Sequence, residues 1–291
     1  MDSSSAFLPF TLCCRGRLVR FDRPAMMGIL NATADSFYDG GRYNSPDALL
    51  AHARQLLAEG AGILDLGVVS SRPGAVLLDP DEETSRLAPL VALLRRELPA
   101  ETIISVDTCY ARPAAAAVEA GADMVNDISG GQFDEQMFPT VASLQVPYIM
   151  MHTRGLPAEM QRPENCRYVD IIGDLVRYFS ERLDTLCRLG VKDIILDPGF
   201  GFAKTAPQCF ELLHRLGELT SLFPDRPLLA GLSNKSFLTS SQLSISNSQL
   251  PAQPELSTLA ANTLALHHGA RLLRVHSPQL ARIASYVTCG Q

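Results

Sequence analysis

The chain has 291 residues, of which 46% are hydrophobic and 19% charged, and its net charge is −6. This composition excludes a disordered chain, and the length suits two small domains or one large α/β domain. The negative charge argues against nucleic acid as a partner, although a local basic pocket is compatible with it. Because no apolar run reaches the roughly 18 residues that span a bilayer, we expect no membrane association.

The seven cysteines are scattered and include no C-x-x-C pair or Cys/His cluster with the spacing of a metal site. We therefore expect reduced thiols in a cytoplasmic protein. The first residues, MDSSSAFLPFTLCCRGR, place no basic segment before an apolar stretch, so we expect no signal peptide.

Short apolar runs alternate with longer segments of helical periodicity along the chain. The runs predict eight strands: MMGILN (26–31), GILDLG (62–67), TIISVD (102–107), DMVND (123–127), PYIMMH (147–152), DIILD (193–197), PLLAGLS (227–233) and RLLRVH (271–276).

Three of the intervening segments carry helix start and stop signals. One has Ser45 as the N-cap and Pro46 in the first turn, and it stops at Gly60. Residues 79–98 have acids in the first turn and arginines in the last, as the helix dipole favours. The longest candidate ends at Gly190. By contrast, residues 239–255 are rich in Ser, Gln and Pro and predict a flexible insertion after the seventh strand.

Eight strand–helix repeats predict a single (β/α)8 TIM barrel over residues 26–291, with residues 1–25 as an extension packed on it. An open doubly wound sheet is the alternative. The barrel is favoured because the strands are continuously apolar and nearly all end in polar residues, which a barrel would gather at one C-terminal mouth. These strand-end residues are Asn31, Asp65, Asp107, Asn126, Asp127, His152, Asp197, Ser233, Arg274 and His276.

Two acids, Asp107 and Asp197, each follow at least three apolar residues. A carboxylate in such a place is partly desolvated and needs hydrogen-bond donors. A ligand with an amino-amidine face, such as a pterin or purine edge, would supply two N–H groups to one carboxylate. The alternative is that each acid caps a helix or pairs with a nearby lysine.

Basic residues form a second group, comprising Arg72, Lys204, Lys235, Arg274 and His276. The loops after strands seven and eight are a frequent phosphate site in barrels, so these residues indicate a phosphorylated or pyrophosphorylated ligand. Solvated side chains are the alternative.

The segment DPGFGFAK (197–204) predicts a stiff turn that presents Phe200 and Phe202. One of these rings could stack on an aromatic ligand, or both could pack at the barrel rim. His152 could be a base or a structural residue of the rim.

Several motifs, in order, resemble those of the dihydropteroate synthase family of pterin-binding barrels. They are GILNATADSF (28–37), SSRPGA (70–75), SVDT (105–108), NDI (126–128), MHTRGLPAEMQ (151–161), LDPGFGFAK (196–204) and RVH (274–276). The resemblance covers roughly residues 26–277. It implies a TIM barrel that joins 6-hydroxymethyl-7,8-dihydropterin pyrophosphate to p-aminobenzoate with the help of Mg2+. Family members are usually dimers, so the resemblance also implies a homodimer.

The resemblance also implies roles for individual residues. Asp107, Asn126, Asp197 and Lys235 would hold the pterin. Arg274 and His276, with Asn31 through Mg2+, would hold the pyrophosphate. Ser71, Arg72, Pro73, Phe202 and Ser236 would contact p-aminobenzoate. Asp35, Ser36 and Phe37 belong to a first loop that would close over the site, and Asp35 and Arg72 join Asp107, Asp197 and Lys235 as candidate catalytic residues.

The chain departs from the family pattern at Ala34 (usually Pro), Val69 (often acidic), Asn234 (usually Arg) and Ser277 (usually Asp). Two alternatives therefore stay open beside an active synthase. One is a pterin-binding homologue with weak or lost synthase activity. The other is a corrinoid-linked methyltetrahydrofolate methyltransferase, which shares the barrel and the pterin acids.

Overall fold

A computed structural model describes residues 7–32, 45–69, 74–238 and 254–290. In these residues eight parallel strands lie in the order β8-β7-β6-β5-β4-β3-β10-β9. A parallel bridge between Leu196 and Leu228 joins the two ends of that order. The sheet is therefore closed, which confirms the barrel and excludes the open-sheet alternative. The strands are β3 (Ala25–Asn31), β4 (Ile63–Gly67), β5 (Ile103–Asp107), β6 (Met124–Asp127), β7 (Tyr148–Met151), β8 (Ile194–Asp197), β9 (Leu229–Ala230) and β10 (Leu272–Val275).

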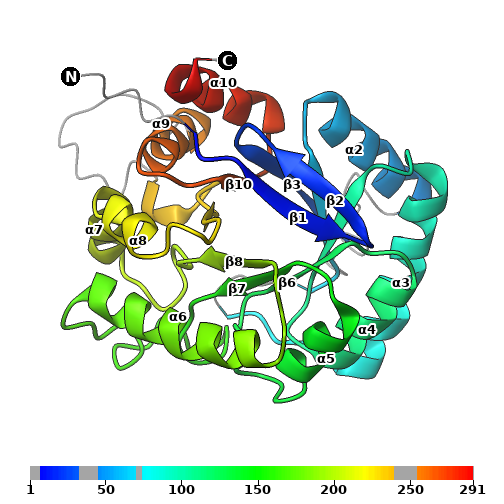
Figure 1. Ribbon diagram of the computed structural model, residues 1–291, viewed down its shortest axis with the longest axis horizontal. Coiled ribbons are helices and arrows are strands. Elements are labelled where there is room, and N and C mark those ends of the chain that lie inside the picture. The colour runs from blue at the N-terminus through cyan, green and yellow to red at the C-terminus, as the bar shows by residue number, and fades with distance from the viewer. Residues whose placement is uncertain (1–6, 33–44, 70–73, 239–253, 291) are drawn as a thin grey trace.

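Helices surround the barrel (Figure 1). The predicted helix starts are confirmed: Ser45 Oγ accepts a hydrogen bond from Ala48 N–H, and Asp79 Oδ1 accepts one from Asp81 N–H. The helices are α2 (Pro46–Ala58), α3 (Pro80–Glu97), α4 (Ala111–Glu119), α5 (Met137–Leu144), α6 (Ile171–Arg188), α7 (Ala206–His214), α8 (Leu216–Leu222), α9 (Pro254–His267) and α10 (Pro278–Cys289), with a 3₁₀ turn, η1, at Ser236–Leu238. Among the described residues, none of the helices is long and apolar enough to cross a bilayer.

Each barrel strand sends alternate side chains to opposite faces. Leu64, Ile104 and Leu273 belong to the large core between the strands and the helices. Ile63, Ile103 and Leu272, each one residue earlier, belong to a separate core inside the barrel. Every second residue along a strand, counted from these inner-core residues, therefore points into the barrel.

A β-hairpin that the strand analysis did not predict covers the floor of the barrel. Its strands β1 (Phe10–Cys14) and β2 (Arg17–Phe21) are antiparallel and lie across the barrel in Figure 1. Phe10, Leu12 and Cys14 join the inner core with the first inward residues of the barrel strands. The hairpin thus seals the end of the barrel opposite the mouth.

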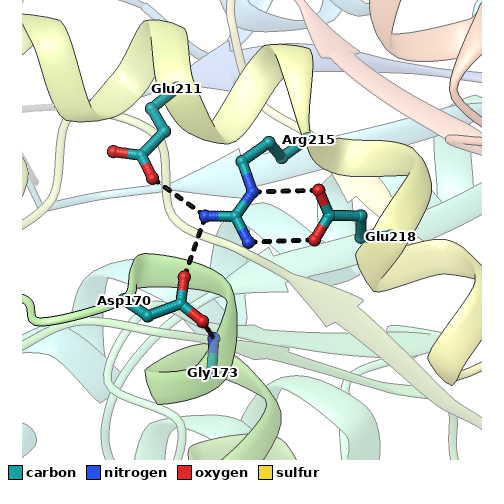
Figure 2. A network of polar contacts seen from close by, with 5 residues as sticks. All are labelled: Asp170, Gly173, Glu211, Arg215 and Glu218. Carbon is teal, nitrogen blue, oxygen red and sulfur yellow. Dashed lines mark hydrogen bonds and ion pairs between the residues drawn. The ribbon is translucent and has the colours of Figure 1, made fainter.

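Outside the barrel, Arg215 links the start of α6 to the junction of α7 and α8 (Figure 2). Its guanidinium donates to Asp170 Oδ1 at 2.8 Å, to Glu211 Oε1 at 2.9 Å and to both carboxylate oxygens of Glu218 at 2.9 Å. Asp170 also caps α6 by accepting from Gly173 N–H. One partly exposed arginine therefore connects three helices that follow β7 and β8.

The predicted strand over 227–233 is short in the structure, where β9 comprises two residues. Leu232 and Lys235 instead form a turn, because Lys235 N–H donates to Leu232 C=O. Most of the predicted insertion, residues 239–253, lies outside the described residues, and its last part begins α9 at Pro254.

Replacing Leu12 by alanine should lower the free energy of unfolding by about 3 kcal/mol, because a buried leucine is removed from the floor of the barrel. Urea denaturation measures this change. Leu18→Ala in the partner strand of the hairpin is the control, since Leu18 is 76% exposed, and it should change stability little. Equal losses in the two variants would show that the hairpin does not pack as described.

Candidate functional site

The inward side chains change from apolar at the floor to polar at the mouth. Asp65 follows Ile63 by two residues, Asn126 follows Met124 by two, and Asp197 follows Ile195 by two, all in the inward register. Asp107 and Arg274 share this register in β5 and β10. The alternation of the strands alone thus brings these five side chains to one mouth.

Arg274 connects three strands at the mouth. Its Nε donates to Asp65 Oδ2 at 2.6 Å, and one terminal nitrogen donates to Asp107 Oδ2 at 2.9 Å. The side chains are largely buried, with 20%, 0% and 9% of Arg274, Asp65 and Asp107 exposed. In such a place charge-assisted hydrogen bonds hold the guanidinium and both carboxylates in fixed positions.

Asp65 belongs to this site, although the sequence analysis named it only as a strand end. Its Oδ2 also accepts a hydrogen bond from Asn126 Nδ2 at 3.0 Å. Its Oδ1 is buried and has no partner. Asp65 therefore orients both the amide of Asn126 and the guanidinium of Arg274. The position two residues after inward Ile63 was the feature from which this could have been predicted.

Asp107 is an acid whose charged form is disfavoured by its surroundings. Burial raises its pKa to about 7, Arg274 opposes the rise, and the nearby carboxylates of Asp65, Glu83 and Asp127 add to it. A ligand that donates N–H groups would favour the ionised form and lower this pKa.

The other side of the mouth holds Asp197 and Lys235. Asp197 Oδ1 accepts a hydrogen bond from Gly199 N–H at 2.7 Å, and burial raises its pKa to about 6. Burial lowers the pKa of Lys235 to about 8, while the carboxylate of Asp197 opposes this change. Lys235 Nζ lies 4.3 Å from the centre of the Phe202 ring, within cation–π range.

His276 lies at the exposed edge of the mouth, beyond β10. Its Nδ1 is 2.9 Å from Ser233 Oγ and 3.5 Å from Asn234 Nδ2. Asn234 has a φ of +56°, a left-handed conformation that asparagine tolerates better than most residues. The asparagine at this departure from the family pattern therefore suits its backbone.

Two strand-end residues, Asp127 and His152, have structural contacts. Asp127 is outward-facing and accepts hydrogen bonds from Ser129 N–H, Gly131 N–H and the Tyr148 hydroxyl. His152 is buried, and its Nδ1 lies 2.9 Å from Lys204 Nζ. The structural alternative for His152 thus fits its surroundings, and Phe200 likewise packs in the core against Phe237.

The remaining predicted residues lie at the mouth, at the start of α10 or outside the described residues. Asn31 and Ser236 are exposed at the mouth, on the end of β3 and the start of η1. Ser277 caps α10 by accepting from Leu280 N–H at 3.4 Å, which explains a serine there. The others lie outside the described residues: Ala34, Asp35, Ser36, Phe37, Ser71, Arg72 and Pro73.

A buried acid that the sequence analysis missed, Glu83, lies beside the site in the first turn of α3. It is 2% exposed, and its Oε1 has no partner. With Asp107, Val69 and Tyr110 it lines a small cavity of about 10 Å³. Burial raises the pKa of Glu83 to about 7, and a hydrogen bond with Thr108 opposes the rise.

Two further observations on the described residues do not extend the candidate site. An open hollow of about 680 Å³ lies at the floor end, between the residues after β2 and α10, and includes none of the predicted site residues. The described residues also contain no cluster of three or more His, Cys, Asp or Glu side chains that could hold a metal ion.

Comparisons with known proteins agree on one family. The family model described as pterin binding enzyme matches residues 27–276. A dihydropteroate synthase of Synechocystis is 43% identical over 256 residues, which cover 87% of this chain and 85% of that protein. The Yersinia pestis dihydropteroate synthase, solved as a sulfonamide drug complex, is 33% identical with a TM-score of 0.84 and covers 96% of this chain and 98% of its own. The Xanthomonas albilineans dihydropteroate synthase, solved with 4-aminobenzoic acid, is 35% identical with a TM-score of 0.81 and covers 95% of this chain and 96% of its own.

The raised pKa of Glu83 makes stability depend on pH. Its pKa of about 7 in the folded chain exceeds the ordinary 4.5, so the unfolded chain releases this proton first as the pH rises. The group therefore costs nothing below pH 4.5, and destabilises the folded chain progressively up to pH 7, by about 3 kcal/mol at most.

Glu83→Gln should therefore raise the free energy of unfolding at pH 8 and change it far less at pH 4.5, as measured by urea denaturation. Glu82→Gln is the control, because the side chain of Glu82 is 48% exposed. The same change in stability at both pH values for Glu83→Gln would contradict the assignment.

Proposed function

The chain belongs to the dihydropteroate synthase family of pterin-binding enzymes, transferases of folate biosynthesis, and from this premise we propose a role for each part of its site. The substrates are 6-hydroxymethyl-7,8-dihydropterin pyrophosphate and p-aminobenzoate. The products are 7,8-dihydropteroate and pyrophosphate. The observation that carries the proposal is the meeting of Asp107, Asn126, Asp197 and Lys235 at one mouth of the barrel, above an apolar inner core.

The pterin binds among Asp107, Asn126, Asp197 and Lys235. The two carboxylates accept the N–H groups of the ring, while the amide of Asn126 and the ammonium of Lys235 bind its polar edge. Support comes from the burial of the two acids, which raises their pKa values to about 7 and 6, so that further N–H donors from a ligand would favour their ionised forms. Asp65 supports this set by fixing the Asn126 amide.

The pyrophosphate binds at Arg274 and His276, with Asn31 nearby. Arg274 already donates to Asp65 and Asp107, so its remaining N–H donors are the ones that a phosphate oxygen can use. His276 is exposed beside Ser233, and both side chains can donate to the same group.

The donor set at the mouth fits one Mg2+ ion bound with the substrate. Mg2+ usually takes one or two protein oxygens together with substrate phosphates and water. Asn31 supplies an amide oxygen at the exposed end of β3. When bound, the ion neutralises charge on the leaving pyrophosphate.

The reaction breaks the bond between the pterin methylene carbon and the pyrophosphate oxygen, and the electron pair leaves with pyrophosphate. The carboxylates of Asp107 and Asp197 stabilise the positive charge that develops on the pterin. The arylamine of p-aminobenzoate is neutral at pH 7 and attacks the methylene carbon without a strong base, and the ammonium that forms then loses one proton to water. The enzyme contributes positioning and the exclusion of water.

The p-aminobenzoate binds beside Phe202 and Ser236, completed by Ser71, Arg72 and Pro73. Phe202 is 9% exposed and lies beneath Lys235, so its ring forms part of the wall between the two substrates. Asp35 and Arg72 complete the candidate catalytic set from the first and second loops. The relative from Xanthomonas, solved with 4-aminobenzoic acid, supports a p-aminobenzoate subsite in this family.

We further propose a homodimer in the cytoplasm. The cytoplasmic location is supported by the seven cysteines, all of which are free. The dimer is supported by α9 and α10, which pack side by side and carry exposed apolar side chains. These side chains are Leu256, Leu264, Ile283, Tyr286 and Val287, with exposures of 39% to 67%.

The purified chain should release pyrophosphate when incubated with the pterin pyrophosphate, p-aminobenzoate and Mg2+. Asp107→Ala should weaken pterin binding at least 30-fold, about 2 kcal/mol, because it removes a charged acceptor from a buried pocket. Asp184→Ala, on the outer face of α6, is the matched control and should bind normally. Pterin binding without pyrophosphate release by the unmodified chain would favour the homologue without synthase activity.

The dimer is tested by light scattering after size-exclusion chromatography. The unmodified chain should have twice the mass of one chain, and Tyr286→Glu should shift it to the monomer, because a charge would be buried in the apolar interface. Val169→Glu is the control, since Val169 is fully exposed on another side of the barrel. A monomeric unmodified chain would overturn the dimer.

A further inference from the structure

We propose that Lys204 is a positioning residue, which holds segment 198–204 in the shape that sets Asp197 on the pterin side and Phe202 on the p-aminobenzoate side. The proposal deepens the function proposed above and rests on it for the identity of the two substrates. Lys204 itself is 2% exposed and contacts other groups of the protein.

The ammonium of Lys204 is surrounded by three acceptors. It donates to Gly199 C=O at 3.1 Å, to Phe202 C=O at 3.1 Å and to His152 Nδ1 at 2.9 Å. Burial lowers the pKa of Lys204 to about 7. In the ammonium form Lys204 has three N–H donors, one for each of these acceptors, and His152 then accepts at Nδ1 as a neutral ring with its proton on Nε2.

The segment that Lys204 holds has an unusual backbone. Gly199, Gly201 and Ala203 have φ values of +68°, +78° and +50°. A left-handed alanine costs roughly 1 kcal/mol and persists where its surroundings enforce it. Segment 198–204 therefore needs external contacts to keep its shape.

Side chains from elsewhere supply those contacts. Besides the two carbonyls that Lys204 binds, Gly201 C=O accepts from Gln161 at 2.7 Å and Ala203 C=O accepts from Tyr168 at 3.0 Å. Lys204 differs from these two residues because it binds two carbonyls of the segment and also His152, next to the end of β7. Lys204 therefore joins the end of the segment to Gly199 and Phe202 within it, and also links the segment to His152 of the barrel.

Gly199 connects Lys204 to Asp197 on the pterin side of the site. Its N–H donates to Asp197 Oδ1 at 2.7 Å, while its C=O accepts from Lys204. A Cβ at Gly199 would lie 2.1 Å from His152 C=O, so the segment lies directly against the end of β7. The peptide groups on both sides of Gly199 are thus fixed, and with them the carboxylate of Asp197.

Lys204 also holds Phe202, which lies on the p-aminobenzoate side of the site. The N–H of Phe202 donates to Gly199 C=O at 3.1 Å and its C=O accepts from Lys204, so the residue is held at both peptide groups. Its ring lies 4.3 Å from Lys235 Nζ. Without Lys204, both the ring of Phe202 and the position of Lys235 lose a support.

The first test measures the local effect, without any assay of activity. Lys204→Met keeps an unbranched side chain, one bond shorter than lysine, and removes all three donors. Hydrogen exchange followed by mass spectrometry should become at least tenfold faster for the amides of residues 199–204 and stay unchanged in the hairpin at 10–21. Unchanged exchange in residues 199–204 would overturn the proposal.

The second test measures the consequence for the reaction. In Lys204→Met the KM for p-aminobenzoate should rise at least fivefold and the KM for the pterin pyrophosphate by a smaller factor. Because the displaced Asp197 also stabilises the charge that develops on the pterin, kcat should fall as well, by a smaller factor than the KM for p-aminobenzoate rises.

Two controls separate positioning from a general loss of stability. Leu12→Ala destabilises the far end of the barrel and should leave both KM values unchanged. Lys192→Met removes an exposed lysine before β8 and should do the same. Equal KM increases in Leu12→Ala and Lys204→Met, or a KM for p-aminobenzoate within twofold of normal in folded Lys204→Met, would overturn the proposal.

If Lys204→Met does not fold, Lys204→Gln takes its place, because glutamine keeps two donors on a side chain one bond shorter. The same changes are then expected at smaller size, and their absence is contrary to the proposal. Failure of the proposed function gives a different result: the unmodified chain would not release pyrophosphate, whereas the exchange measurement would still decide whether Lys204 holds the segment.

Discussion

The hydrogen bonds of Arg274 to Asp65 and Asp107 are the interaction on which the rest of the site depends. They join β10 to β4 and β5 and hold two carboxylates close together in a buried place. Without the guanidinium, two neighbouring buried acids would repel each other, and at least one would take up a proton. Asn126 depends on the same arrangement because its amide binds Asp65. The guanidinium of Arg274 therefore allows Asp65, Asp107 and Asn126, from β4, β5 and β6, to lie side by side at the mouth.

Much of the fold and of the site could be predicted from the sequence because strand alternation is a local property. Asp107, Asn126 and Asp197 come at fixed intervals after inward apolar residues, so counting in twos leads to the mouth without knowledge of the structure. The helix starts at Ser45 and Asp79 were equally local, since a cap depends on residues within one turn. Closure of the sheet could be inferred only from the number of repeats.

Other features depend on contacts between distant parts of the chain and could not be read locally. The hairpin of β1 and β2 is short, and its apolar side chains gain apolar partners only when the barrel strands have come together. Glu83 looks like an ordinary acid in the first turn of a helix, yet α3 places it in the interior beside Asp107. Lys204 resembled a candidate ligand for an anion, whereas its acceptors come from within its own loop and from His152.

The hairpin over the floor also governs how protons reach the site. The inner core, which includes Phe10, Leu12, Met27 and Ile63, is apolar and buried and closes the barrel below the acids. Exchange of protons between Asp107 and bulk water must then pass through the mouth, where the substrates bind. The pKa of Asp107, about 7 without a ligand, means that both of its protonation states are populated near neutral pH. A ligand that donates N–H groups to Asp107 favours its ionised state, so binding of the pterin would release the proton of Asp107 through the same opening by which the substrate enters.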